Sequence, residues 1–167
     1  MKIHIIGCGG SGKTYLAKAL SNKYDIPHFD LDDVQWDNRA DSYGVKNSPQ
    51  KRNELLQEIL DNEQWIIEGV YYKWVGLSFE EADTIYVLDM PKYLYKSRII
   101  IRFFKRKLGL EKGKKETIKS VRALLKWTDT FQDKNMSEIR KILEAYQEKV
   151  IWIKSKKEIK DIIRINT

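Results

Sequence analysis

Eight residues near the amino terminus have the types and spacing that bind phosphate. Residues 7–14 fit the pattern G-x-x-x-x-G-K-[ST] and directly follow the apolar residues 3–6. In this pattern the glycines let the backbone turn so that its N–H groups point at an anion. Lys13 is expected at the β- and γ-phosphates, and the Thr14 hydroxyl at Mg²⁺. The predicted ATP-binding residues are Gly7, Gly9, Gly10, Ser11, Gly12, Lys13 and Thr14.

Carboxylates follow three further apolar runs that have the length and composition of strands. The runs are residues 26–31, 65–67 and 84–88, and the carboxylates are Asp30 and Asp32, Glu68, and Asp89. The carboxyl ends of parallel strands meet at one edge of a sheet, where ligands bind. We therefore expect these carboxylates at the same edge as the phosphate loop, with Asp30 and Asp32 on the side where Mg²⁺ would lie.

Arginines recur every fourth residue on a helix predicted from Pro91 to about Leu108. Arg98, Arg102 and Arg106 then share one helical face. A lysine-rich stretch follows up to residue 134, with a helical pattern from residue 118 onward. The row is either a cationic cover for the phosphates of a nucleotide or a solvated basic face.

The charge of the chain is unevenly distributed. Residues 1–89 contain nine Lys/Arg and fifteen Asp/Glu, a net charge of −6, whereas residues 90–167 contain twenty-two and nine, a net charge of +13. Such asymmetry is typical either of nucleic-acid binding or of a mobile basic segment over phosphates. The single cysteine excludes an internal disulfide, and no apolar run or signal peptide indicates a membrane or secreted protein. We expect a cytoplasmic protein.

Strands and helices alternate along the 167 residues, which is one domain by size. Adding residues 3–6 and 150–153 gives five strands, which predicts an α/β fold with a parallel sheet covered by helices on both faces. Residues 37–47 are expected as a loop, and Ser48 and Pro49 as the start of a helix. Asn135 and Glu138 are expected to cap a further helix that carries Tyr146.

These features together resemble the adenylate-kinase-like branch of the P-loop kinases, which includes shikimate and gluconate kinases. The resemblance rests on the phosphate loop, on residues 30–32, and on residues 88–91 followed by Arg98 and Arg102. Within that branch the chain is most similar to the bacterial DNA topology modulation proteins, through residues 65–71 and 149–153. It departs from many of those proteins at Val70, where they have asparagine.

The resemblance implies a three-layer P-loop fold and a Mg²⁺-dependent kinase that transfers the ATP γ-phosphate to a small acceptor, possibly a nucleoside or nucleotide. Residues 37–64 would bind the acceptor, and residues 105–134 would form a lid. Arg98 and Arg102 correspond to the lid arginines, and Asp30 and Asp32 to an acidic pair near the acceptor or Mg²⁺.

The predicted catalytic residues are Lys13, Arg98, Arg102 and Asp30, and the predicted metal ligands are Thr14 and Asp32. An alternative function is a nucleic-acid-associated ATPase or a regulator of DNA topology, favoured by the basic carboxyl half and by the resemblance to the DNA topology modulation proteins. Roles for Glu68, Arg39 and Arg52 stay open at this point, as do direct DNA binding and the choice between a monomer and a homodimer.

Overall fold

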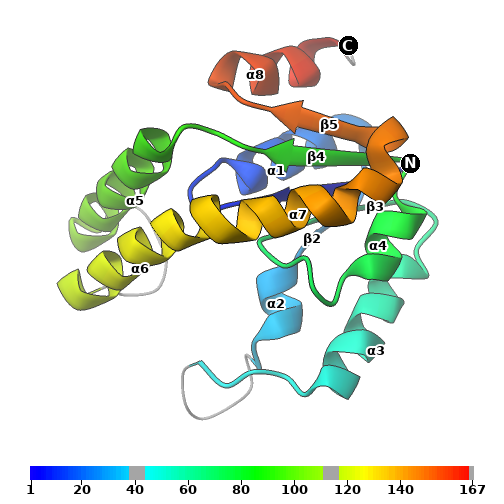
Figure 1. Ribbon diagram of the computed structural model, residues 1–167, viewed down its shortest axis with the longest axis horizontal. Helices are drawn as coiled ribbons and strands as arrows, with labels where there is room; N and C mark the ends of the chain where they lie inside the picture. Colours follow the sequence, from blue (N-terminus) through cyan, green and yellow to red (C-terminus); the bar gives the residue numbers. More distant parts are fainter. Residues whose placement is uncertain (38–43, 111–116, 166–167) are drawn as a thin grey trace.

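A five-stranded parallel sheet forms the centre of the protein in the computed structural model, which describes residues 1–37, 44–110 and 117–165 (Figure 1). The order of the strands is β2-β3-β1-β4-β5, and every neighbouring pair is parallel. The strands are β1 (Lys2–Gly7), β2 (His28–Asp30), β3 (Trp65–Gly69), β4 (Thr84–Leu88) and β5 (Val150–Ile153). The five predicted strands and the α/β fold are confirmed.

The central strands are apolar because helices cover both of their faces. Ile5, Ile66 and Ile85 are completely buried on adjacent strands. Helix α1 (Lys13–Tyr24) buries Leu16 and Leu20 and packs beside α8 (Lys156–Ile165). Figure 1 shows α7 (Met136–Leu143) crossing in front of the sheet, where its Met136, Ile139 and Leu143 join the same core.

Two helices extend beyond the sheet and pack on each other. They are α5 (Lys92–Lys107) and α6 (Ile118–Thr130), which lie side by side in Figure 1. We call this pair the lid hairpin. It begins soon after β4 and includes the whole of α5, whereas the predicted lid, residues 105–134, contains only the last residues of that helix. Thr117 caps α6 by accepting a hydrogen bond from the Ser120 N–H.

The lid hairpin is joined to the core by one continuous helical rod. Helix α6 passes through a π-helical segment, Phe131–Asn135, directly into α7. The capped helix start predicted at Asn135 is wrong, because Asn135 has helical backbone angles and its side chain makes no cap. Tyr146 lies outside α7, in the 3₁₀ turn Glu144–Lys149.

Two further parts of the structure differ from the prediction, and one agrees with it. The second strand ends at Asp30, and α2 (Leu31–Gln35) begins where the strand was expected to continue, because Asp30 caps it. Helix α4 (Gly76–Glu81) lies in a stretch for which no helix was predicted. Helix α3 (Pro49–Leu60) is confirmed, with Ser48 as its cap. No helix within the described ranges is long and apolar enough to cross a membrane.

Candidate active site

The phosphate loop connects β1 to α1 through two glycines with left-handed backbone angles. Gly10 has φ 79° and Gly12 has φ 108°, a region that other residues adopt only with strain. Gly12 stands at the amino-terminal end of α1, whose free N–H groups and dipole favour an anion. Lys13 is the first residue of the helix, and its ammonium donates to the Cys8 carbonyl over 3.2 Å.

Glu68 organises the centre of the site. It ends β3, is only 2% exposed, and accepts a 2.5 Å hydrogen bond from the Thr14 hydroxyl. The Lys13 ammonium lies 3.9 Å and the His28 ring 3.8 Å from its carboxylate. Burial is the largest influence and would raise the pKa of Glu68, but His28, Lys13 and Thr14 together hold it below its usual value. At 3.8 Å, His28 acts as a neighbouring charge or dipole, because this distance exceeds a hydrogen bond.

Asp30 lies beside Glu68 at the end of the adjacent strand. The two residues are register partners in the β2–β3 ladder. One Asp30 oxygen accepts a 2.9 Å hydrogen bond from the Asp32 N–H and so caps α2. Burial, and then the charge of Glu68, raises the pKa of Asp30 to about 6. A carboxylate with such a pKa accepts a proton more readily than an ordinary aspartate.

Hydrogen bonds and one backbone bridge hold the residues that follow Asp30. The Tyr71 hydroxyl donates to an Asp32 oxygen over 2.7 Å. Trp36 forms an antiparallel bridge with Lys46, and the Asn47 side chain donates to the carbonyls of Val34 and Trp36. Lys46 and Asn47 of the predicted acceptor segment are therefore held beside Trp36 by the bridge and by these hydrogen bonds.

The structure describes one of the two arginines, Arg52 and Arg39, whose roles stayed open in the sequence analysis. Arg52 is half-buried, donates to the Gln35 side chain over 3.0 Å and stacks on Trp74 at 5.3 Å. Arg39 falls outside the described residues, as do the rest of residues 38–43 and residues 111–116 of the predicted lid.

The three arginines of the row on α5 make two kinds of contact. Arg98 donates to the carbonyls of Gly10 and Ser11, at 2.9 and 2.5 Å, and so braces the phosphate loop from behind. Arg102 and Arg106 instead line the cavity in front of the loop. The catalytic role of Arg98 stays a prediction, and its contacts favour a positioning role.

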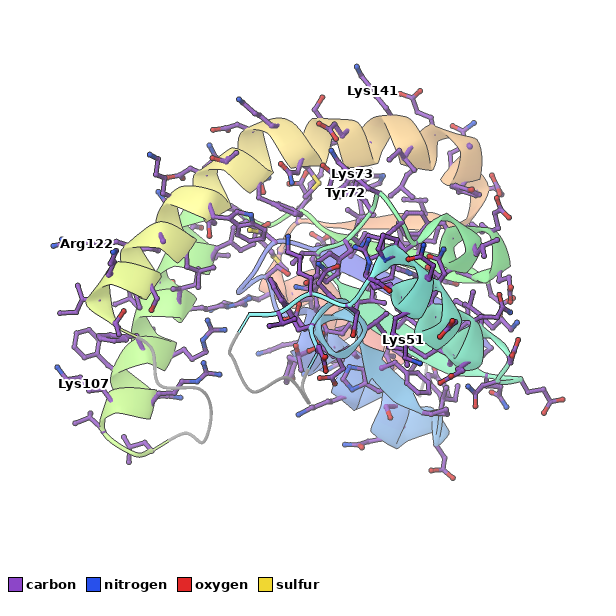
Figure 2. The ribbon with its side chains drawn as sticks, turned by 90° about the horizontal axis from the view of Figure 1, so that it is seen from below. Lys51, Tyr72, Lys73, Lys107, Arg122 and Lys141 are labelled. Carbon is purple, nitrogen blue, oxygen red and sulfur yellow. The ribbon has the colours of Figure 1, made fainter. Side chains whose placement is uncertain are left out.

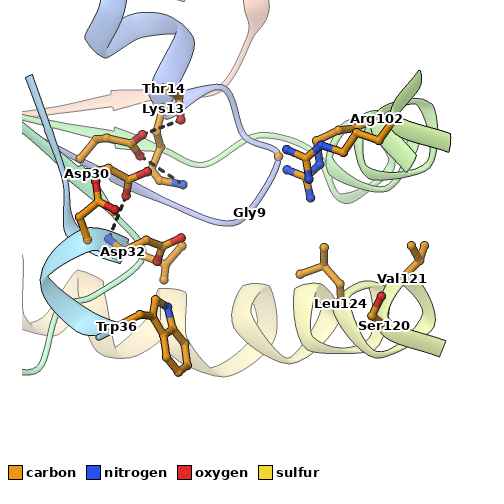
Figure 3. A pocket seen from close by; sticks show the side chains of 16 residues that line it. Gly9, Lys13, Thr14, Asp30, Asp32, Trp36, Arg102, Ser120, Val121 and Leu124 are labelled. Carbon is orange, nitrogen blue, oxygen red and sulfur yellow. Dashed lines mark hydrogen bonds and ion pairs between the residues drawn. The ribbon is translucent and has the colours of Figure 1, made fainter. Parts of the chain in front are cut away.

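A cavity of about 1030 Å³ brings most of the predicted residues together (Figure 3). Figure 3 shows Asp30, Asp32 and Trp36 at one end, Arg102 and Leu124 at the other, with Lys13 and Thr14 near the carboxylates. The lining residues are Gly9, Gly10, Lys13, Thr14, Asp30, Asp32, Asp33, Trp36, Glu68, Gly69, Val70, Arg102, Arg106, Ser120, Val121 and Leu124.

Asp89 lies at the predicted sheet edge but does not line the cavity. It accepts hydrogen bonds from Gln132 in the π-helical segment and from Arg140 in α7. Asp89 therefore lies at the strand-end edge, as expected, but not among the carboxylates that line the cavity. Arg140 also stacks on Trp152 at 4.3 Å. The contacts of Asp89 therefore join the helical rod to the end of the sheet.

Several lining residues were not among the predicted site residues. Arg106 was visible in the sequence as the third member of the arginine row. Trp36 and the α6 residues Ser120, Val121 and Leu124 carry no local pattern that indicates a site. The α6 residues reach the cavity because α6 lies over the loop, where Leu124 and Trp127 lie against Gly9, whereas Trp36 reaches it from the end of α2.

The oxygen atoms near Thr14 suit Mg²⁺ bound together with phosphates. No group of three or more acidic, histidine or cysteine side chains within the described ranges forms a metal cage. Mg²⁺ needs no such cage, because it usually keeps water and binds one or two carboxylates plus substrate phosphates. Thr14 and Asp32, the predicted ligands, both line the cavity.

Comparison with known proteins places the fold in a known class. No family model matches the chain. A gluconokinase from Sinorhizobium meliloti 1021 has a similar structure, with a TM-score of 0.56 and 14% identity over 98% of this chain and 87% of that one. At this identity the likeness shows the fold alone, a P-loop kinase fold.

One curated protein is similar in sequence. The uncharacterized protein YqaC of Bacillus subtilis (strain 168) is 30% identical over 105 residues, which is 62% of this chain and 57% of YqaC. The matched region therefore spans little more than half the length of that relative. Neither comparison names the DNA topology modulation family, so that resemblance stays a prediction.

Proposed function

We propose that the protein is an ATP- and Mg²⁺-dependent phosphotransferase that acts on a small hydroxyl compound. The observation that carries the proposal is the arrangement of one cavity. Lys13 and the amino-terminal end of α1 lie at its centre, the Asp30 and Glu68 carboxylates on one side, and Arg102 and Arg106 on the lid side. Phosphoryl transfer depends mainly on such positioning and charge stabilisation.

The residues divide the work of binding ATP. Loop N–H groups and Lys13 would bind the β- and γ-phosphates, and Arg102 and Arg106 would neutralise charge that develops on the transferred group. Mg²⁺, when bound, would offset phosphate charge and link the phosphates to Thr14 and Asp32. Because Glu68 already binds Thr14 and faces Lys13, it presets both side chains.

The transfer itself requires a proton acceptor. The acceptor oxygen forms a bond to the γ-phosphorus while the bond from that phosphorus to the β,γ-bridging oxygen breaks, and ADP leaves with the bond electrons. The acceptor proton passes to the Asp30 carboxylate, whose pKa of about 6 suits it to take a proton near neutral pH.

The fold similarity supports the class of reaction, because the similar structure is that of a protein named as a gluconokinase. Its name leaves the acceptor of the present protein open. The lid hairpin also supports a kinase function, because its Arg102 and Arg106 line the cavity that contains the phosphate loop.

A second candidate function rests on the outer surface of the lid hairpin. Figure 2 shows Lys107 and Arg122 projecting outward from α5 and α6, and both are exposed. These side chains lie outside the cavity lining, which supports a nucleic-acid-associated ATPase as the alternative. DNA binding that weakens steeply with salt, and that Lys107→Ala and Arg122→Ala reduce together, would support it. Absence of binding near 0.1 M salt would exclude it.

Calorimetric titration of ATP with and without Mg²⁺ tests the kinase proposal. Lys13→Ala should weaken ATP binding by about 10²-fold or more, because Lys13 supplies the charge at the centre of the loop. Lys18→Ala removes an exposed lysine from the same helix and should bind ATP as the unmodified protein does. Failure of the unmodified protein to bind ATP, or equal binding by Lys13→Ala, would refute the proposal.

A further inference from the structure

A histidine outside the cavity lining faces the carboxylate that organises the site. His28 lies on β2, at one edge of the sheet, and its side chain is 15% exposed. Its Nε2 atom lies 3.8 Å from Oε1 of Glu68. His28 is not among the residues that line the cavity. The transfer reaction proposed above therefore gives this residue no part.

The pairing of β2 with β3 accounts for this contact. Side chains two residues apart on a strand point to the same face of the sheet. His28 therefore shares a face with Asp30, whose register partner is Glu68, while the register partner of His28 is Ile66. The histidine thus lies diagonally across the ladder from Glu68, within reach of a long side chain.

The surroundings of the His28 ring favour a proton on Nε2. This atom is buried and has no hydrogen-bond partner among the residues that the structure describes. A lone pair on Nε2 would face a negatively charged oxygen, whereas an N–H group would present its positive end to that oxygen. Burial raises the pKa of Glu68, and of the groups that lower this pKa His28 has the largest effect. Both observations support an N–H group that faces Glu68.

Glu68 in turn orients the Thr14 hydroxyl. This hydroxyl has a single proton, which it donates to the same Oε1 atom over 2.5 Å, as the dashed line at Thr14 in Figure 3 marks. Its lone pairs are then available to the cavity, which Thr14 lines. A hydroxyl coordinates Mg²⁺ through a lone pair, so the position of Oε1 decides whether Thr14 presents oxygen or hydrogen to the ion.

The two oxygens of the Glu68 carboxylate have different partners. Oε1 faces Thr14 and His28, and Oε2 lies 3.9 Å from the Lys13 ammonium. A glutamate carboxylate turns easily about its last bond, so these partners hold its plane. Lys13 is expected to bind the β- and γ-phosphates of ATP, which would draw it from Oε2. His28 lies outside the cavity lining and would keep its contact with the carboxylate when ATP is bound.

We propose that His28 is a positioning residue for Mg²⁺-dependent ATP binding. Its Nε2–H group orients the Glu68 carboxylate, and Glu68 holds the Thr14 hydroxyl with its lone pairs toward the ion. This inference rests on the proposed kinase function and adds to it a residue that touches neither ATP nor the acceptor.

Calorimetry of ATP, with Mg²⁺ and with a chelator, tests the inference. His28→Leu removes the N–H group at similar volume. The gain in ATP affinity that Mg²⁺ provides should fall at least about threefold, because partners behind a metal ligand govern metal affinity. Affinity for Mg²⁺-free ATP should change by less than about twofold, since the loop and Lys13 are intact. His28→Gln keeps an N–H group near the position of Nε2 and should restore most of the gain.

A double-mutant cycle tests the route through Glu68. Glu68→Met removes both oxygens and keeps an unbranched side chain. If His28 acts through Glu68, adding His28→Leu to Glu68→Met should change the Mg²⁺-dependent gain by less than about 1.5-fold. Thermal melting of each variant measures any loss of packing in β2, which would affect stability without selecting for Mg²⁺.

Nuclear magnetic resonance gives a reading that needs neither nucleotide nor metal. Correlation of ¹⁵N with ¹H in the imidazole rings of the unliganded protein should show a proton on Nε2 of His28. The chain contains two histidines, so His28→Gln identifies the His28 signals by their loss.

The possible results separate this inference from the proposed function. A neutral His28 ring protonated only at Nδ1, equal losses with and without Mg²⁺, or an undiminished effect of His28→Leu beside Glu68→Met would each overturn the inference. The kinase proposal would then stand, because the unmodified protein would still bind ATP. Absence of ATP binding by the unmodified protein would refute the proposed function and the inference together.

Discussion

The end of the cavity that contains Asp30, Asp32 and Glu68, here called its acidic end, and the lid hairpin are held in place by different kinds of contact. Glu68 and Asp30 stand at the ends of adjacent parallel strands, so backbone hydrogen bonds of the sheet determine their separation. Arg102 and Arg106 stand on α5, which leaves the sheet and packs on α6. The ion pairs Lys92–Asp133 and Lys96–Asp129 link α5 to the rod formed by α6, the π-helical segment and α7.

The contacts that hold the side chains also differ in strength between the two regions. At the acidic end, burial of Glu68 and capping of α2 hold each carboxylate to one geometry. At the lid end, α5 buries Tyr95 and Ile99, and the ion pairs that link it to the rod are exposed or half-exposed, each worth at most about 1 kcal/mol. Hydrogen bonds of the sheet thus set the positions of Glu68 and Asp30, whereas helix packing sets those of Arg102 and Arg106. We therefore expect substitutions at the lid to act mainly on turnover, and substitutions near the sheet to act on pH dependence and ATP binding.

The largest effect is expected at the lid end of the cavity. Arg102→Ala should lower kcat for phosphate transfer by about 10³-fold, because a correctly placed arginine stabilises the charge of the transferred group. The affinity for ATP, measured by calorimetry, should change far less. Lys105→Ala on the same helix removes an exposed cation and should keep kcat within about twofold. Equal losses in the two variants would show that general basicity of the lid, and not this arginine, matters.

A smaller loss, with a distinct pH signature, is expected at the acidic end. Because the pKa of Asp30 is raised to about 6, kcat/KM should rise with pH through about 6 as the carboxylate ionises. Asp30→Asn should lower kcat by about 10²-fold and remove that ascending limb. A limb at the same pH in the variant would assign it to another group.

The same substitution also has a signed effect on stability. The folded-state pKa of Asp30 lies above its ordinary value of 3.8, so ionising this residue in the folded protein disfavours folding above pH 6. Asp30→Asn should therefore raise the melting temperature at pH 7.5, and the gain should shrink as the pH falls from about 6 to about 4. Glu63→Gln, at an exposed glutamate outside the cavity, provides the control.

A moderate effect is expected where the lid touches the phosphate loop. Arg98→Ala removes two hydrogen bonds to loop carbonyls and should weaken ATP binding by about tenfold, since hydrogen bonds from a charged donor are worth roughly 1.5–3 kcal/mol. Arg98→Lys keeps the charge but not the forked geometry, and should restore only part of the affinity. A loss of kcat without a loss of affinity would instead support the catalytic role predicted from the sequence.

The smallest effect is expected at the joint between the lid hairpin and the sheet. Asp89→Asn weakens the contacts with Arg140 and Gln132 and should lower the free energy of unfolding by about 1 kcal/mol in urea denaturation. Transfer activity should fall less than in any variant above, because Asp89 does not line the cavity. Glu144→Gln, at an exposed residue beyond α7, should leave the unfolding free energy unchanged within about 0.5 kcal/mol.

Sequence patterns predicted the elements that depend on local rules. The apolar runs and the glycine-lysine pattern located all five strands and the start of α1, because strand burial and loop geometry are encoded within a few neighbouring residues. Helix α4 escaped prediction because its six residues are too few to show a helical period. The continuous helix from α6 to α7 was not predicted, because Asn135 and Glu138 have the spacing of a helix start. The helix continues because Phe131 and Met136 pack in the core.

The sequence alone determined that a phosphate loop, carboxylates at strand ends and a row of arginines exist in this chain. Only the tertiary structure decided the partner of each, because those contacts join residues far apart along the chain. Glu68 meets Thr14 across 54 residues, Arg98 meets Gly10 across 88, and Arg140 meets Asp89 across 51. Local periodicity carries no information about such pairs. They follow from strand order and helix packing, which bring one arginine to the loop and turn one carboxylate away from the site.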